Sequence, residues 1–99
     1  MNKSVLELIV ANHPGVMSHV CGLFSRRAYN VDAIICLPIG DGTRSTIWLL
    51  VCEDAKLDQM VKQLLKLQDV QDVKRHSPGL GIFQTLDELL SRNSVHRAQ

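Results

Sequence analysis

The sequence NHPGVMSHVCGLFSRRAYN, residues 12–30, decides how this chain folds. Residues 4–11 before it are largely apolar and alternate as in a strand. The letters NHPG then predict a turn, and apolar residues at spacings of three and four predict an amphipathic helix over about 15–28. Because apolar residues resume at Val31, the stretch predicts a strand, a turn, a helix and a second strand in succession.

The second strand is predicted over residues 31–39, with Pro38 favouring an edge position because it cannot donate to a neighbouring strand. The Gly-Asp-Gly sequence at 40–42 predicts a hairpin. The third strand, 44–52, is apolar on both faces in its middle, so we expect it to be central and covered on both sides.

A second helix is predicted over 55–67, capped by Asp54, and a short polar fourth strand over 69–76. This βαββαβ order predicts an α/β (α+β) two-layer sandwich of the ferredoxin-like type, with both helices on one face of a four-stranded antiparallel sheet. Gly22 inside the first helix costs up to about 1 kcal/mol relative to alanine, which suggests close approach of another backbone.

The domain is predicted to span residues 1–76, followed by a linker and an amphipathic tail over 77–99. The linker is indicated by SPGLG, and the tail helix by one apolar stripe. Two alternatives remain open for this tail: it packs on its own domain or frays, or it docks on another subunit. The stripe consists of Phe83, Leu86, Leu89 and Leu90.

Composition excludes several functional classes. A net charge of +1 and an aromatic content of 4% disfavour a nucleic-acid or acidic-membrane partner. The three cysteines, Cys21, Cys36 and Cys52, are far apart without zinc spacing, which is typical of buried thiols in a reducing compartment. The N-terminus resembles neither a signal peptide nor a membrane span, so a cytoplasmic protein is expected.

The sequence contains no recognisable catalytic constellation. Ser18 and His19 point apart on a helix and cannot form a nucleophile–base pair. His13 could contact a ligand, although a solvated turn histidine is more common. Trp48 is most often a core residue, but its face of the strand, opposite the residues expected to meet the helices, also suits a subunit interface.

Asn12, Gly15 and Asn30 flank the first predicted helix and form a candidate ligand site. The first N–H groups of a helix lack internal partners, and its dipole favours an anion there. Since the next strand has to return beside this helix, we predict that the three residues converge and bind the carboxylate of a free amino acid. Each also has a structural explanation: Asn12 as the N-cap, Gly15 as turn geometry and Asn30 as the end of the helix.

The stretch NHPGVMSHVCGLFSRRAYNVDAIICLPI, followed by STIWLLV, resembles the ACT domain in the small, regulatory subunits of bacterial acetohydroxyacid (acetolactate) synthases. The resemblance covers residues 4–76. It is specific, because other ACT domains share the glycine of the turn but not the continuation CGLFSRRAYNV. It is greatest to the isozyme I type, which lacks the second C-terminal domain of longer small subunits.

This resemblance implies a homodimer in which edge strands of two chains join into one sheet, with valine bound for feedback inhibition at the seam between two ACT domains. It implies a large catalytic subunit as partner, which this chain activates and which carries thiamine diphosphate, magnesium and FAD. The chain itself is expected to hold no cofactor, no metal and no catalytic residue. The effector positions implied by the resemblance are Asn12, Gly15, Val16, Met17, Asn30 and Val31.

In this arrangement the backbone N–H groups of Gly15 and Val16 receive the valine carboxylate. A side-chain oxygen from Asn12, or from Asn30 of the partner chain, accepts from the ammonium group. Val16, Met17 and Val31 line a small apolar pocket, where burial of one isopropyl group contributes about 2 kcal/mol.

Three alternatives remain. The chain could be a structural activator that docks its apolar sheet face and tail on the catalytic subunit and binds no ligand. It could be an ACT module that senses another amino acid. A ferredoxin-like RNA or metal binder is disfavoured by the neutral charge, the few aromatics and the absence of a CxxC pair.

Overall fold

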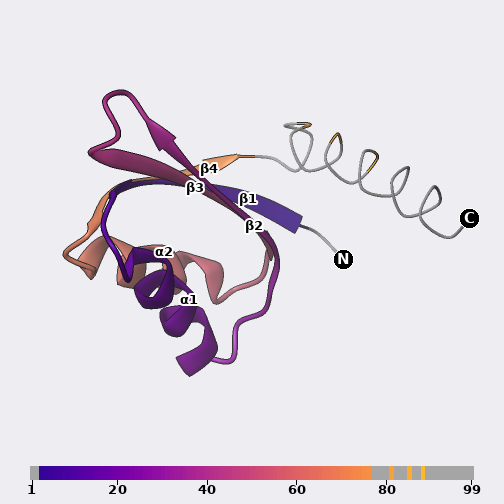
Figure 1. The fold of residues 1–99 in the computed structure, drawn as a ribbon. Helices are drawn as coiled ribbons and strands as arrows, with labels where there is room; N and C mark the ends of the chain where they lie inside the picture. The colour runs from indigo at the N-terminus through magenta and orange to yellow at the C-terminus, as the bar shows by residue number, and fades with distance from the viewer. Residues whose placement is uncertain (1–2, 77–80, 82–84, 86–87, 89–99) are drawn as a thin grey trace, which may run out of the picture.

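The computed structural model describes residues 3–76, 81, 85 and 88, and within this part the chain forms two helices and four strands. Both helices lie on one face of the sheet, which confirms the predicted βαββαβ sandwich (Figure 1). Apart from residues 81, 85 and 88, the predicted linker and tail over 77–99, including all four residues of the apolar stripe, lie outside the described residues. The elements are β1 (Lys3–Ala11), α1 (Val16–Arg26), β2 (Val31–Ile39), β3 (Arg44–Cys52), α2 (Leu57–Lys66) and β4 (Val70–His76).

The sheet has the order β2-β3-β1-β4, and every neighbouring pair is antiparallel. The strand β2 lies at an edge, as Pro38 predicts, and β3 is central, as its apolar pattern predicts. The expectation that β3 is covered on both faces is wrong for the described chain, because both helices pack on the same face (Figure 1). On the other face, Trp48 and Leu50 are half-buried.

The strand register determines which segments meet at each end of the sheet. Ile39 pairs with Arg44, and Arg44 pairs with Ala11, so the end of β2 and the end of β1 share one row. At the opposite end of the sheet, the start of β2 at Val31 pairs with Val51. The turn that follows β1 therefore lies at the same end as the β2–β3 hairpin, far from the start of β2.

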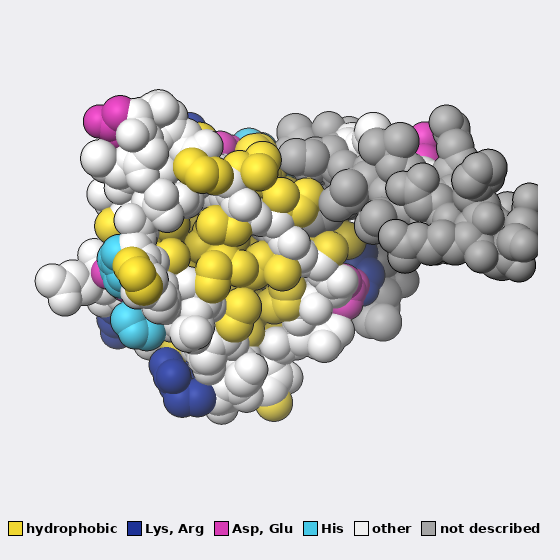
Figure 2. All heavy atoms as spheres, viewed as in Figure 1, with side chains coloured by type: hydrophobic (Ala, Val, Ile, Leu, Met, Phe, Trp, Pro, Cys, Tyr) yellow, Lys and Arg dark blue, Asp and Glu magenta, His cyan; other side chains and the backbone are white. Residues whose placement is uncertain are grey.

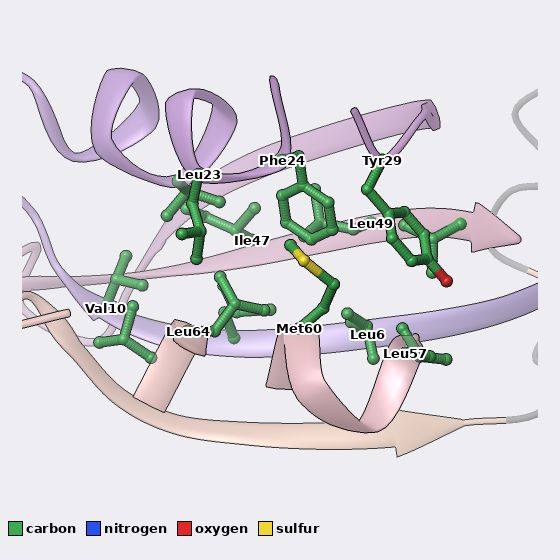
Figure 3. Packing of buried hydrophobic residues seen from close by; sticks show 14 of the residues in the cluster. Leu6, Val10, Leu23, Phe24, Tyr29, Ile47, Leu49, Leu57, Met60 and Leu64 are labelled. Atoms are coloured by element: carbon green, nitrogen blue, oxygen red, sulfur yellow. The ribbon is translucent and has the colours of Figure 1, made fainter. Parts of the chain in front are cut away.

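The core lies between the sheet and the helices, where alternate residues of β1 and β3 meet one stripe from each helix (Figure 3). Each fully buried aliphatic or aromatic side chain contributes about 1.5–3 kcal/mol. Met60 and Phe24, from different helices, point toward each other above the sheet (Figure 3). The buried residues include Leu6, Leu8, Val10, Val20, Leu23, Phe24, Ile47, Leu49, Val51, Leu57, Met60 and Leu64.

The helix α1 begins at Val16, close to the predicted start, but its N-cap and its end differ from the prediction. Gly15, with a φ of 93°, is the residue at the N-cap position, and no side chain caps the helix. Asn12 is therefore not the N-cap. The helix ends at Arg26, earlier than predicted, and Ala28 turns the chain with a φ of 53°. Asn30 lies beyond this turn and does not end the helix.

The second helix is shorter than predicted, because Asp54 acts in the turn before it. The Asp54 carboxylate accepts a hydrogen bond of 2.8 Å from the Lys56 N–H, and its carbonyl accepts one of 3.1 Å from the Leu57 N–H. The helix starts only at Leu57.

Gly22 has no backbone close to it within the described chain. A Cβ added there would meet only Arg26 Nη1, at 3.4 Å. The predicted close approach of another backbone is therefore wrong for the single chain.

Candidate functional site

The corner between β1 and α1 presents free backbone donors. In the described part of the chain, the N–H groups of Gly15, Met17 and Ser18 make no hydrogen bond. The Val16 N–H, predicted to be free, instead donates to the His13 carbonyl oxygen at 3.3 Å. Because these donors lie at the positive end of α1, the corner suits a small anion such as a carboxylate.

Asn12 joins this corner to the β2–β3 hairpin. Its side-chain Nδ2 donates to the Gly42 carbonyl at 2.7 Å, and its backbone N–H donates to the Thr43 carbonyl at 3.0 Å. Asn12 is exposed, and its Oδ1 atom makes no hydrogen bond within the described residues. This oxygen is thus available to accept from an ammonium group.

Two apolar residues of the predicted site lie at the start of α1. Val16 belongs to the core and is only 4% exposed, so its side chain is directed away from solvent. Met17 is half-buried and packs against the core from the side. At this corner, Met17 is therefore the better placed of the two to line a ligand pocket.

Asn30 and Val31 lie at the other end of α1. The helix has 11 residues and is about 16 Å long. The chain does return beside α1, as predicted, but it does so at the C-terminal end of the helix. One chain therefore does not bring Asn30 and Val31 to the Gly15 corner, and the predicted convergence within a chain is wrong.

Asn30 lines two shallow hollows near the start of β2. One, of about 370 Å³, lies between α1 and β2 and includes Cys21, Phe24 and Ile34. The other, of about 350 Å³, includes Lys3 and Asp32, which form an ion pair. Asn30 is exposed and donates through Nδ2 to Asp32 Oδ1 at 2.8 Å, which leaves its side-chain oxygen without a hydrogen bond among the described residues.

The open edge of β2 continues into an apolar surface. Figure 2 shows hydrophobic side chains gathered in a broad patch between the sheet and α1, with histidine side chains at its border. Half-buried hydrophobic residues of α1 and β2 pack against the core here, and they include Met17, Val31, Ile34 and Cys36. An apolar surface beside an unpaired strand edge is typical of a subunit interface.

A cluster that sequence analysis missed links the corner to the loop before β4. His13 Nε2 lies 2.6 Å from Asp69 Oδ1, and His19 Nδ1 lies 2.9 Å from Asp69 Oδ2. The contact with Asp69, with a further one to the Pro14 carbonyl, raises the pKa of His13. Hydrogen bonds from His13 and His19 lower the pKa of Asp69. His13 is exposed to solvent, as expected of a turn histidine, and it is also held by these two contacts.

The described residues contain no group of three or more His, Cys, Asp or Glu side chains arranged to hold a metal ion. Among the helices of this part, none is long and apolar enough to cross a membrane.

Solved structures share this fold. The crystal structure of an acetolactate synthase small subunit from Thermotoga maritima superposes with a TM-score of 0.72 at 31% identity, over 81% of this chain and 50% of that one. The regulatory subunit of aspartate kinase from Thermus thermophilus superposes with a TM-score of 0.63 at 18% identity, over 76% of this chain and 50% of that one, which shows a common fold only.

Proteins of similar sequence identify the family to which this chain belongs. The acetolactate synthase isozyme 1 small subunit of Escherichia coli K12 is 55% identical over 82 residues, which are 83% of this chain and 85% of that protein. The isozyme 3 small subunit of the same strain is 37% identical over 78% of this chain but only 48% of its own length. The family profile described as the AHAS small subunit-like ACT domain matches residues 6–72. This chain therefore belongs to the ACT-domain family of acetolactate synthase small subunits.

Proposed function

We propose that this chain is a regulatory subunit of acetolactate synthase that activates the catalytic subunit and confers feedback inhibition by valine, bound between two ACT domains of a homodimer. Membership of the small-subunit family supports a regulatory partner role. The observation that carries the valine site is the position of the Gly15 corner, at the same end of the sheet as the end of β2.

The unpaired edge of β2 is the natural contact between two copies. If two β2 strands pair antiparallel about a two-fold axis near Ile35, residue 31 of one chain lies opposite residue 39 of the other. Ile39 is in the same row as Ala11, which leads into the Gly15 corner. The partner's Asn30 is then brought to the end of the sheet at which this corner lies, whereas Asn30 of the same chain lies at the opposite end.

The composite site accounts for each group of a free amino acid. The N–H groups of Gly15 and Met17 receive the carboxylate. The side-chain oxygens of Asn12 and the partner's Asn30 accept from the ammonium group. Met17 and the partner's Val31 border the aliphatic side chain, whose burial contributes about 2 kcal/mol for an isopropyl group. This energy favours valine over polar amino acids but separates it only modestly from leucine and isoleucine.

Regulation follows from the position of the ligand between chains. A ligand that contacts both copies binds best to one arrangement of the dimer and shifts the population toward it. The catalytic subunit, which is expected to carry thiamine diphosphate, magnesium and FAD, responds to that arrangement through its contact with this chain. The coupling is reciprocal, so the catalytic subunit also changes the affinity for valine.

The direct test combines calorimetry of the chain with valine and an assay of the reconstituted enzyme. We expect valine to release heat on binding, and the chain to raise acetolactate synthase activity in a manner that valine reverses. Activation without any valine binding or inhibition would instead support the structural activator. Binding of leucine in preference to valine would identify a module for another amino acid.

A further inference from the structure

The ring of His13 lies between two hydrogen-bond acceptors. Its Nδ1 atom is 2.7 Å from the Pro14 carbonyl oxygen, and its Nε2 atom is 2.6 Å from Asp69 Oδ1. A neutral imidazole carries one N–H and can donate to only one of them, whereas the imidazolium donates to both. The geometry is therefore that of a protonated His13.

Asp69 is itself held firmly. Its second carboxylate oxygen accepts from His19 Nδ1 at 2.9 Å, and its backbone carbonyl accepts from the Ala11 N–H at 2.9 Å. Asp69 thus joins the end of β1 and the first turns of α1 to the loop before β4. The acceptor that faces His13 has a fixed position.

The Pro14 carbonyl belongs to the same peptide unit as the Gly15 N–H. This unit is trans and planar, so its oxygen and its hydrogen point in opposite directions. In a regular helix the Pro14 oxygen would accept from the Ser18 N–H, but here its hydrogen bond comes from His13. By holding the oxygen, His13 sets the direction of the Gly15 N–H, away from its own ring.

We propose that His13, held by Asp69, is the positioning residue of the effector corner: in its protonated form it aims the Gly15 N–H at the ligand carboxylate, so that affinity for valine falls as His13 loses its proton. This inference rests on the proposed valine site. It adds a pH dependence and assigns a role to residues 13 and 69. By linkage, bound valine increases the affinity of His13 for its proton.

The groups that contact the His13 ring determine whether the affinity for valine rises or falls with pH. Within the described chain, the titratable groups that contact His13 are Asp69, which is anionic, and His19, whose ring lies edge-on with centroids 6.3 Å apart. The hydrogen bond to Asp69 raises the pKa of His13 above 6.5, and the bonds from His13 and His19 lower the pKa of Asp69 below 3.8. Between pH 3.8 and pH 6.5, His13 is protonated and Asp69 is ionised, so the ion pair is fully formed. The ion pair is lost as the pH rises through the raised pKa of His13.

The experiment measures the dissociation constant of valine by calorimetry from about pH 5.5 to pH 8.5, a range that contains the histidine titration. Four chains are compared: wild type, His13→Gln, Asp69→Asn and His76→Gln. His76 is the matched control, because its Nε2 also contacts a carboxylate, Glu7 Oε1, at 2.8 Å. Any titration of valine itself affects all four chains equally.

We expect the wild type and His76→Gln to lose about tenfold in affinity across this range. His13→Gln should bind weakly with a flat profile, and Asp69→Asn should shift the midpoint to lower pH. A flat wild-type profile, or an unchanged slope in His13→Gln, would overturn the inference.

A second readout does not need valine. In two-dimensional NMR, the Gly15 amide should follow the titration of the His13 ring in the wild type and become independent of pH in His13→Gln. If the wild type binds no valine at any pH, the proposed function fails. The Gly15 amide signal then tests separately whether His13 orients this peptide unit. If the Gly15 signal does not change as His13 titrates, the positioning role of His13 is refuted.

Discussion

The side-chain Nδ2 of Asn12 donates a hydrogen bond of 2.7 Å to the carbonyl oxygen of Gly42. Through this contact the loop before α1 is fixed to the hairpin that follows β2. The hairpin end of β2 is also where a two-fold partner would bring the start of its own β2. In the proposed homodimer, a change at the seam could therefore reach the proposed ligand corner through Asn12 and Gly42, without crossing the core.

Gly15→Asp should remove valine binding. A Cβ at Gly15 meets no atom within 4 Å, so there is room for a side chain, although the φ of 93° strains any residue other than glycine. The substitution places a carboxylate where the ligand carboxylate is proposed to bind. Like-charge contact of this kind should weaken affinity about 100-fold, as measured by calorimetry. Activation of the catalytic subunit should be retained.

Gly15→Asn is the matched control, because Asn and Asp are similar in size and both tolerate a positive φ. Both variants should lose a similar stability of about 1–2 kcal/mol in urea unfolding. If Gly15→Asn weakens valine as much as Gly15→Asp, strain and not charge explains the loss, and the carboxylate is assigned to the wrong place.

Leu37→Lys should weaken the proposed homodimer. Leu37 is 53% exposed on the edge strand β2, so the substitution leaves the monomer core intact but adds a charge on each side of the seam. We expect the dimer dissociation constant to rise about tenfold or more in sedimentation velocity. Leu65→Lys, at a residue of α2 that is 50% exposed, should have no effect. Equal effects of the two variants would contradict pairing through β2.

The hydroxyl of Tyr29 should lose its proton at a higher pH than an ordinary tyrosine does. Burial, with the nearby charge of Asp54, raises the pKa of its hydroxyl from 10.0 to about 12. The hydroxyl donates to the Cys52 carbonyl and to Asp54 Oδ1. Because the folded state favours the protonated form, its stabilising contribution is complete below pH 10 and is lost as the pH rises through about 12.

The chain has one tyrosine, so tyrosinate absorbance reports on Tyr29 alone. The native midpoint should lie near 12, and the midpoint in denaturant near the ordinary value of 10.0. Coincident midpoints would show that the hydroxyl is not held by these contacts.

The strands could be predicted closely where two signals agree. The bounds of β2 and β3 match the predicted 31–39 and 44–52 because the Gly-Asp-Gly turn separates two apolar runs. The predicted start of α1 at about residue 15 agrees with the observed start at Val16, but the N-cap is Gly15 and not Asn12, although Asn12 has the chemistry of an N-cap. Local propensity did not reveal that the hairpin offers Asn12 a better partner.

The candidate site could be predicted only in part, because some of its contacts join residues that are far apart in the sequence. The free donors at Gly15 follow from a strand, a turn and a helix. The contact of Asp69 with His19 joins residues separated by 50 positions, and no local pattern predicts it. The separation of Asn30 from Gly15 could have been inferred from the length of α1 between them, and for this reason the proposed site takes Asn30 from a second chain.

Mixing two defective chains tests this composite site most directly. Gly15→Asp damages the corner of its own chain, and Asn30→Ala removes the group supplied to the partner. A heterodimer of the two contains one intact site, with its corner from the Asn30→Ala chain. After exchange in equal amounts, calorimetry should recover about a quarter of the wild-type sites at wild-type affinity, although each variant alone binds weakly. No recovery on mixing, with heterodimers present, would contradict a valine site built from two chains.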